Sequence, residues 1–554
     1  MPGSADPMNC WTVSSSQDAG MTTTLVISGG TVHDGSGGPG RVADVLVEGD
    51  RITAVRPGVG ELDGVPVLDA TGLVVAPGFV NVLSHAYFTL EKDGRGLSDL
   101  YQGVTTQVFG EGTSIGPHTP EVRAELESGN APDDPPLVWD RLSEFLAHLE
   151  GKGVAQNVVS FVGAHNLRMI GAGSDDRPMT AAELSRVRGV LDEELADGAL
   201  GIGSALIYPP GCFASTDELV ALCEVVARYG GTYVSHLRSE GDHFLDAVDE
   251  LITIGRRAGV HAEIYHLKAA GQHNWPKMAR AVERVEAARA AGQPVTADVY
   301  PYLAGQTQLG SSIPPDFHEG GHEALASRLA DPAERARIRA AVTTPSERWE
   351  NLYLAAGGAD GVMLLPDPNG PAVEYRGLSL RQAADQHGTD PVEMLLRLVE
   401  LEPTLHAMYF MMSEETLRTA LRNPWVSVGS DAPTFATEAP YADVPTHPRA
   451  YGTFARILGR YVREQSLLTL GEAVRRMTSL PAGNLGLRDR GLLAPGKYAD
   501  IVVFDPETVG DHATYEEPHR YATGVRHVVV NGRPALADGV PTGQLSGRAL
   551  RRGR

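Results

Sequence analysis

Pro77-Gly-Phe-Val-Asn-Val-Leu-Ser-His85 is the stretch that decides the fold, because it has the composition of a short buried strand and ends in a histidine. On a strand, residues i and i+2 point to the same face of the sheet, so Leu83 and His85 share one face. A His-x-His pair at this place would give one metal ion two ligands, whereas Leu83 can give none. The rest of the chain must therefore show whether a metal site survives.

The same pattern recurs through the middle of the chain, where apolar runs alternate with amphipathic helical segments such as Asp217–Tyr229, His243–Arg257 and Pro276–Ala291. Strands that alternate with helices indicate a parallel sheet. Eight of them predict an α/β fold, a (β/α)8 TIM-like barrel, whose site lies at the carboxyl ends of the strands. The predicted strands are Gly78–His85, Thr105–Gly112, Asn157–His165, Ala199–Ile207, Gly231–Arg238, His261–Lys268, Pro294–Tyr302 and Trp425–Ala432.

The two ends of the chain are rich in short strands. Alternating runs separated by turns occupy residues 25–76, and the Gly49-Asp50 pair between two of them is a hairpin signal. Similar runs, Ala499–Asp505 and Val525–Gly532, lie near the other end. We therefore expect one small β-sandwich formed from residues 22–76 and 488–545.

The span between strands seven and eight is too long for a simple connection. It holds helical patterns of its own, at Pro332–Val342 and Leu380–Leu401, and so predicts an inserted subdomain that covers the mouth of the barrel. The expected division is residues 303–376 for this insertion or lid, 77–302 and 377–487 for the barrel, and 1–21 for a disordered leader.

Composition narrows the possible partners and the compartment. The net charge of −23 argues against nucleic acid or an anionic membrane as the main partner, since either would need a basic face. No apolar run reaches the ~18 residues of a membrane span. The three cysteines, Cys10, Cys212 and Cys223, cannot form a disulfide framework, which favours a reducing compartment such as the cytoplasm.

Polar side chains stand at the predicted carboxyl ends of five strands. These residues are His85, Glu111, His236, His266 and Asp431. Imidazole nitrogens and carboxylate oxygens around an open barrel mouth are typical of a zinc site that keeps a position free for water. A lone histidine at a strand end is more often a hydrogen-bonded structural group. The convergence of five such residues at one end of the barrel favours the metal-site hypothesis.

A set of short motifs adds a family resemblance, and taken together these motifs are specific. They are Ala76-Pro-Gly-Phe, Gly103-Val-Thr-Thr, Gly198-Ala-Leu-Gly, Tyr208-Pro-Pro-Gly-Cys-Phe-Ala-Ser215, Ser235-His-Leu-Arg238, His266-Leu-Lys268, Asp298-Val-Tyr-Pro-Tyr302, Gly429-Ser-Asp431, His447-Pro-Arg-Ala-Tyr-Gly-Thr-Phe454 and Gly496-Lys-Tyr-Ala-Asp500. From about Leu25 to Ala535 the chain resembles the amidohydrolase superfamily, and within it the N-acyl-D-amino-acid deacylases (D-aminoacylases).

The resemblance implies a role for each metal-site residue. His236 and His266 take the positions of the two histidines that bind the tightly held zinc, and Glu111 stands where the family usually has a cysteine ligand. A carboxylate oxygen is an acceptable zinc ligand, so this exchange keeps the site. Asp431 matches the catalytic aspartate, which would take a proton from water and pass it to the leaving amine.

The resemblance also implies a substrate-binding set. Lys268, Tyr300 and Arg449 match residues that hold the carboxylate of the acylated amino acid. Surface salt bridges for Lys268 and Arg449, and core packing for Tyr300, are the structural alternatives. Arg449 is also spaced further from Asp431 than the family pattern has it.

The departures from the family pattern concern the second metal. Leu83 replaces the first histidine of the His-x-His pair, and Asn81 replaces an aspartate just before it. We therefore expect one zinc ion, held by Glu111, His236 and His266. His85 is then free either to donate a hydrogen bond to the developing oxyanion or to orient Asp431.

The function that follows is the zinc-dependent hydrolysis of a linear amide in a small molecule, most simply the deacylation of an N-acyl-D-amino acid. Two alternatives remain at this point. One is another amidohydrolase reaction, on a cyclic amide or a specialised metabolite, and the other is a non-catalytic relative that binds a ligand. The segment Met408-Tyr-Phe-Met-Met412 is a candidate for lining an acyl pocket, although core packing explains it better.

Overall fold

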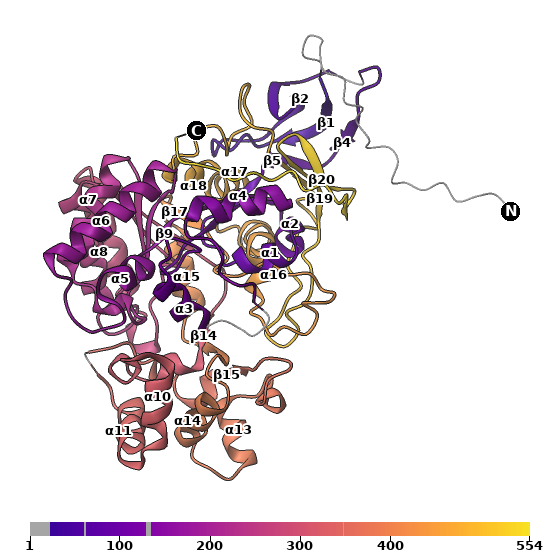
Figure 1. Cartoon of the computed structure of the whole chain (residues 1–554). Helices are drawn as coiled ribbons and strands as arrows, with labels where there is room; N and C mark the ends of the chain where they lie inside the picture. The colour runs from indigo at the N-terminus through magenta and orange to yellow at the C-terminus, as the bar shows by residue number, and fades with distance from the viewer. Residues whose placement is uncertain (1–22, 60–61, 129–133, 347, 554) are drawn as a thin grey trace.

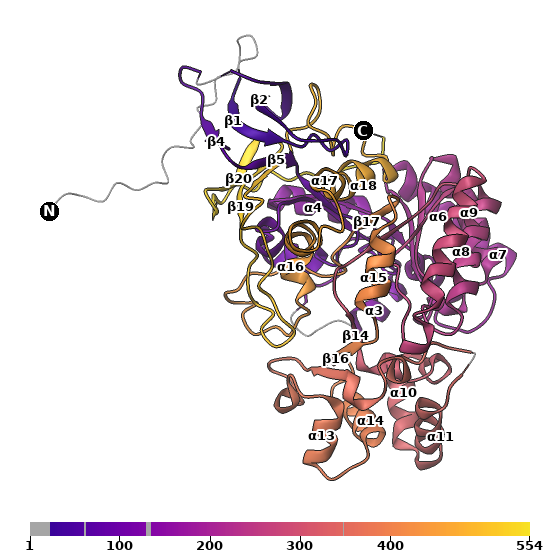
Figure 2. The same ribbon diagram turned by 180° about the vertical axis from the view of Figure 1, so that it is seen from behind.

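The computed structural model describes residues 23–59, 62–128, 134–346 and 348–553. The expected leader, residues 1–21, and Cys10 lie outside the described residues. A β-sheet domain lies at one end of the molecule, a barrel lies in the middle, and the insertion, a mixed α/β unit, lies at the other end (Figures 1 and 2). None of the helices among the described residues combines the length and the apolar character of a membrane span.

The middle part is the predicted barrel, and all eight predicted strands are confirmed. Its strands are parallel to one another, and the two ends of the barrel wall meet at a bridge between Ser84 and Ala432. In chain order they are β6 (Phe79–Asn81), β7 (Val104–Phe109), β8 and β9 (Asn157–Ser160 and Val162–Gly163, two parts of one strand), β10 (Gly201–Ala205), β11 (Thr232–His236), β12 (His261–Ile264), β13 (Val295–Val299) and β17 (Val426–Val428).

Amphipathic helices cover the barrel, and their ends follow local rules. At α7, the Ser215 side chain accepts from the Glu218 amide while the Glu218 carboxylate accepts from the Ser215 amide, which closes a capping box. The buried stripe of α7 includes Cys223, as expected for a core position. The helices are α1 (Tyr87–Lys92), α2 (Leu97–Leu100), α3 (Pro120–Ser128), α4 (Leu142–Lys152), α5 (Ala164–Ala172), α6 (Ala181–Ala196), α7 (Thr216–Arg228), α8 (Phe244–Ala258), α9 (Lys277–Ala290), α15 (Glu414–Leu421), α16 (Arg449–Arg456), α17 (Leu470–Met477) and α18 (Ser479–Asn484).

Both ends of the chain form one β domain, as predicted. Its strands join in a single nine-stranded sheet, in which β5 from the first end pairs antiparallel with β18 from the second. The Gly49-Asp50 turn connects β2 to β3, and Gly49 has a φ of 58° that suits glycine. The strands are β1 (Leu25–Val32), β2 (Arg41–Glu48), β3 (Arg51–Arg56), β4 (Val67–Asp69), β5 (Val74–Pro77), β18 (Ile501–Phe504), β19 (Val525–Val530), β20 (Arg533–Ala537) and β21 (Val540–Pro541).

The insertion between β13 and β17 has a sheet and a hydrophobic core of its own. This core runs from Leu309 to Met411, and β16 pairs with both β14 and β15, so the unit extends past the boundary expected at residue 376. The helical pattern Leu380–Leu401 divides into α13 and α14, because Asp390 caps a new helix that starts at Pro391. The elements are β14 (Ala304–Gln308), α10 (Gly321–Ala330), α11 (Pro332–Thr343), α12 (Leu352–Ala355), β15 (Val362–Leu365), α13 (Leu380–Gln386), α14 (Pro391–Leu401) and β16 (His406–Phe410).

Candidate metal centre

Three of the predicted ligands converge at the mouth of the barrel. Glu111 follows β7, His236 ends β11 and His266 follows β12. The Oε1 atom of Glu111 lies 3.1 Å from Nδ1 of His236 and 3.1 Å from Nε2 of His266. The three candidate ligand atoms all lie within 4.8 Å of one another, and both histidines are buried. This geometry brings together the predicted metal ligands.

Two of the site residues have an unusual backbone. His266 has a φ of 34° and Asp431 a φ of 52°, a left-handed region that residues other than glycine seldom occupy. The surrounding structure holds both in place, because the His266 amide donates to Asp298 Oδ1 (3.0 Å) and the Asp431 amide donates to the Leu83 carbonyl (2.8 Å). Strained backbone that is fixed in this way is concentrated at functional sites.

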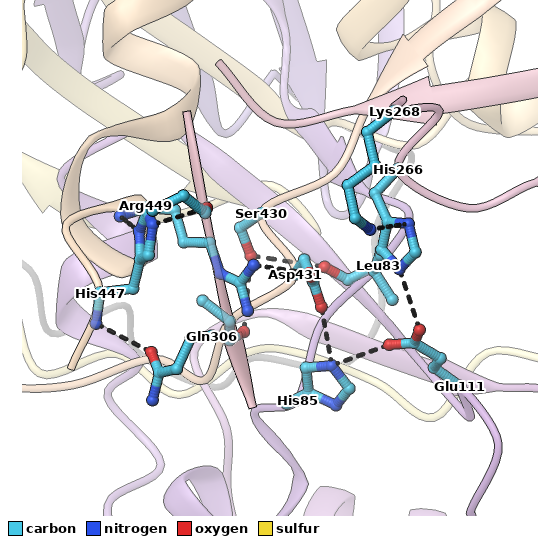
Figure 3. A network of polar contacts seen from close by, with 12 residues as sticks. Leu83, His85, Glu111, His266, Lys268, Gln306, Ser430, Asp431, His447 and Arg449 are labelled. Carbon is cyan, nitrogen blue, oxygen red and sulfur yellow. Dashed lines mark hydrogen bonds and ion pairs between the residues drawn. The ribbon is translucent and has the colours of Figure 1, made fainter. Parts of the chain in front are cut away.

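His85 and Asp431 stand beside this cluster, as Figure 3 shows. Nε2 of His85 lies 3.1 Å from Asp431 Oδ1 and 3.1 Å from the second oxygen of Glu111, so a second group of candidate ligands shares Glu111 with the first. Leu83 is buried next to them and offers no side-chain ligand. The second group therefore has one histidine where a His-x-His pair would supply two.

Asn81, the other departure from the family pattern, has a structural contact. Its amide nitrogen donates to Ser430 Oγ (2.8 Å), and its amide oxygen accepts from the Ser430 backbone (2.9 Å). Ser430 precedes Asp431, so this pair of hydrogen bonds joins β6 to the segment after β17. A neutral amide thereby helps to fix the position of the catalytic candidate.

Neighbouring charges favour the ionised forms of Glu111 and Asp431. Burial alone would raise the pKa of Glu111, but contacts with His236, His266 and His85 hold it well below its usual range. Burial likewise opposes the ionisation of Asp431, and the Arg449 cation outweighs it, so the pKa of Asp431 is lowered. Burial opposes protonation of His85, but hydrogen bonds to Asp431 and Glu111 raise its pKa to about 9.

Arg449 and Tyr300 lie together on the Asp431 side of the cluster. Nη1 of Arg449 lies 2.6 Å from Asp431 Oδ2, and its guanidinium lies 4.7 Å from the centre of the Tyr300 ring. Both side chains are buried, so Arg449 is not part of a surface salt bridge. Within the described part of the chain, the Tyr300 hydroxyl and Arg449 Nε have no hydrogen-bond partner. Buried donors of this kind normally have a partner, and a bound anion would supply one.

Lys268, predicted to contact the substrate, lies beside Glu240 and His266. Its ammonium lies 2.8 Å from Glu240 Oε1 and 2.8 Å from His266 Nδ1, and the side chain is 7% exposed. It is therefore part of a buried ion pair and not of a surface salt bridge. Burial opposes the charge on Lys268, yet Glu240 raises its pKa. The ammonium of Lys268 is thus held within the candidate metal site, next to one of the predicted ligands.

Glu240 is the site residue that the sequence interpretation missed. Its Oε1 lies 3.0 Å from His266 Nδ1 and its Oε2 lies 3.3 Å from His236 Nε2, although the second contact lacks the angle of a hydrogen bond. One carboxylate therefore faces the ring nitrogens that point away from Glu111. The available signal was its place four residues after His236, in the loop that leaves β11.

Comparison with known proteins agrees with this geometry. The model of the family described as "Amidohydrolase family" matches residues 66–536. A D-aminoacylase from Alcaligenes xylosoxydans xylosoxydans is 34% identical over 545 residues, which cover 97% of this chain and 99% of the relative.

The chain belongs to the amidohydrolase family. It is also 36% identical to an N-acyl-D-glutamate deacylase from the same organism, over 95% of this chain and 96% of that protein. Among solved structures, the N-acyl-D-glutamate deacylase of Bordetella bronchiseptica, in complex with zinc and a phosphonate mimic of the tetrahedral intermediate, superposes with a TM-score of 0.78 at 31% identity. That match covers 96% of this chain and 99% of the other. The similarity places the chain in the N-acyl-D-amino-acid deacylase branch.

The donor set of this amidohydrolase fits a zinc ion. One carboxylate oxygen and two imidazole nitrogens are ordinary zinc ligands at about 2.0–2.2 Å, which requires donor atoms as close together as those of Glu111, His236 and His266. Histidine ligands usually donate their other N–H to a carboxylate. Glu240 lies 3.0 Å from His266 Nδ1, close enough to accept a hydrogen bond, and faces His236 Nε2 at 3.3 Å, which leaves Nδ1 of His236 and Nε2 of His266 for the metal.

Proposed function

We propose that this amidohydrolase hydrolyses the linear amide bond of N-acyl-D-amino acids or related acyl-amino conjugates, with one zinc ion held by Glu111, His236 and His266. The observation that carries the proposal is the position of one Glu111 oxygen 3.1 Å from both imidazoles, with Asp431 and His85 alongside. Two relatives at 34% and 36% identity are themselves a D-aminoacylase and an N-acyl-D-glutamate deacylase.

Two features support a single ion. Leu83 removes one ligand from the second group of candidates, which leaves His85, Glu111 and Asp431. In addition, the guanidinium of Arg449 already neutralises the outer oxygen of Asp431 at 2.6 Å. A second dication would therefore meet a positive charge and only one imidazole, and its binding would be weak.

The residues of the chain divide the catalytic work. A bound zinc ion would polarise the scissile carbonyl and lower the pKa of a coordinated water to about 7. Asp431, kept ionised by Arg449, is placed to accept the proton and to return it to the leaving nitrogen. The 3.1 Å contact between His85 and Asp431 supports an orienting role for His85 over a role as oxyanion donor.

The unpartnered donors of Tyr300 and Arg449 support a place for the substrate carboxylate. A carboxylate that accepted from the Tyr300 hydroxyl and Arg449 Nε would satisfy both buried groups at once. Charge-assisted hydrogen bonds from a guanidinium are among the stronger ones in proteins. The leaving amino acid would thus be held on the Asp431 side of the metal, next to the group that protonates it.

The test is direct. Racemic N-acetyl and N-octanoyl amino acids are incubated with the zinc-loaded enzyme, and the products are separated by chiral chromatography. We expect the D enantiomers to be consumed and the L enantiomers to remain. If neither enantiomer of any of these N-acyl amino acids is hydrolysed, the proposed function is refuted.

Metal analysis of the same preparation tests the number of ions. About one zinc per chain is expected, and Leu83→His, which restores the missing imidazole, should raise the number towards two. Two tightly bound ions in the natural protein would contradict our account of Leu83.

Cys212 and Cys223 are free thiols in the structure, and we propose on that ground that the enzyme is located in the reducing cytoplasm.

A further inference from the structure

A large cavity lies between the mouth of the barrel and the insertion. Its volume is about 510 Å³, within the usual range for small-molecule sites. Apolar side chains come from both parts, with Ile115, Leu137 and Met169 on the barrel side and Ile313, Leu325 and Leu329 on the insertion side. The insertion therefore supplies half of a binding space as well as covering the mouth.

The cavity begins beside the metal centre. Tyr87 and Thr113, which line it, come two residues after His85 and Glu111 respectively. Tyr208 also lines it, and its ring lies 5.5 Å from the ring of His236. Neither Arg449 nor Tyr300 is among the described lining residues, so the cavity is separate from the place assigned to the substrate carboxylate.

The charge of the lining selects among possible ligands. No lysine or arginine lines the cavity among the residues that the structure describes, whereas Glu125, Glu350 and Glu400 do. Glu125 and Glu400 are exposed, and Glu400 already pairs with Arg335 at 2.8 Å, whereas Glu350 is further inside. A buried carboxylate of a ligand would find no lysine or arginine in this lining to offset its desolvation, which is unfavourable. The cavity therefore suits an uncharged group.

We propose that this cavity binds the acyl group of the substrate, and that the preferred acyl group is a medium-length, uncharged chain. The inference rests on the proposed function and deepens it. With the amino-acid carboxylate at Tyr300 and Arg449, the other half of the amide must leave the metal centre elsewhere, and the cavity starts on the Glu111 and His236 side. A two-carbon acetyl group would leave most of the 510 Å³ unfilled, whereas an eight-carbon chain would bury its methylenes against the apolar walls.

The first experiment compares three acyl groups on one D-amino acid: acetyl, octanoyl and 7-carboxyheptanoyl, which is an octanoyl chain that ends in a carboxylate. Each methylene buried is worth about a fourfold gain in kcat/KM. We expect octanoyl to exceed acetyl by at least ~100-fold, and the carboxylate-ended chain to lose most of that gain. Equal kcat/KM for all three would refute the cavity assignment alone, whereas no hydrolysis of any would refute the proposed function on which it rests.

The second experiment narrows the cavity. Ser311, on the turn of 3-10 helix Leu309–Ser312, lines it, and Ser311→Trp should lower the ratio of octanoyl to acetyl kcat/KM at least ~10-fold. Ser327→Trp is the matched control, because Ser327 is exposed on α10 and does not line the cavity. Met169→Trp repeats the test from the barrel side, in case Ser311→Trp fails to fold. If the folded variants keep the full octanoyl preference, the acyl group binds elsewhere.

Discussion

Buried carboxyl groups lie at the mouth of the barrel and within strand β12, and their surroundings differ. At the mouth, Glu111 contacts imidazoles, Glu240 contacts Lys268 and both histidines, and Asp431 contacts Arg449. On β12, only three residues before His266, Glu263 contacts only the neutral groups of Thr296 and Asn484 in the described structure. Burial raises the pKa of Glu263 to about 7.

This difference in surroundings determines which buried carboxyl groups are ionised. The barrel tolerates a buried carboxyl with neutral hydrogen-bond partners, and burial then favours its protonated form up to a pH of about 7. Glu111, Glu240 and Asp431 at the mouth are instead next to positively charged or protonatable groups, which lower the pKa of each carboxyl. This arrangement suits metal binding and proton transfer, and it can be tested one residue at a time.

The largest effect is expected from the loss of a metal ligand. His236→Ala should remove both bound zinc and turnover, because one of the three ligands that hold the ion is lost. Metal content by mass spectrometry and hydrolysis rates measure the two losses together. His243→Ala, at the exposed N-terminus of α8, is the control and should keep both. Normal metal content in His236→Ala would refute the proposed site.

A smaller effect is expected from the proton acceptor. Asp431→Asn should keep the zinc and lower kcat about 10²–10⁴-fold, because the amide cannot take up a proton. Asp538→Asn is a matched control, since Asp538 has a φ of 51° against 52° for Asp431 and is exposed to solvent. An Asp431→Asn enzyme that works at the natural rate would exclude the proton relay.

A substitution of Glu240 tests whether a carboxylate that contacts the histidine ligands, but not the metal itself, contributes to zinc affinity. Glu240→Gln keeps the shape of the side chain but removes the negative charge that faces the ring nitrogens of His236 and His266, so zinc affinity should fall about 10–100-fold. Competition with a fluorescent chelator measures the affinity without reference to turnover. Glu194→Gln, which alters a buried glutamate of α6, is the control. Unchanged affinity would reduce Glu240 to a counter-ion for Lys268.

The carboxylates at the mouth could not all be predicted from the sequence: Glu111 and Asp431 were predicted, whereas Glu240 was not. Glu111 and Asp431 could be found because parallel strands bring their carboxyl ends to one edge, so each apolar run predicts where its following residue lies. Glu240 sits in the loop after β11, and its contact with both imidazoles depends on how that loop turns back. The pairing of Arg449 with Asp431 likewise depends on the loop between β17 and α16.

The insertion is a larger example of structure that depends on contacts between distant segments and could not be predicted from the local sequence. Its helical patterns were visible in the sequence. However, β16 pairs with β14, about a hundred residues earlier, and with β15, about 45 residues earlier, so the end of the insertion could not be placed from local composition. The cavity is formed by side chains that are scattered from Tyr87 to His406. Met408 and Met411, the segment considered for an acyl pocket, are buried in the insertion instead.

The smallest effect is expected from Glu263, and it would appear in stability. The pKa of Glu263 rises from 4.5 to about 7 on folding, so the folded protein binds more protons than the unfolded chain between these values. This contribution to stability is therefore lost as the pH rises from about 4.5 to about 7, by roughly 3 kcal/mol in all. Glu263→Gln should remove this pH-dependent loss of stability. The Tm of the variant, relative to the Tm of the natural protein, should therefore rise between pH 5 and pH 8. Glu283→Gln, on the exposed face of α9, should follow the natural protein throughout. A Glu263→Gln variant with the pH dependence of the natural protein would mean that Glu263 is ionised when buried, and the contrast between the mouth and the buried carboxyl of β12 would then fail.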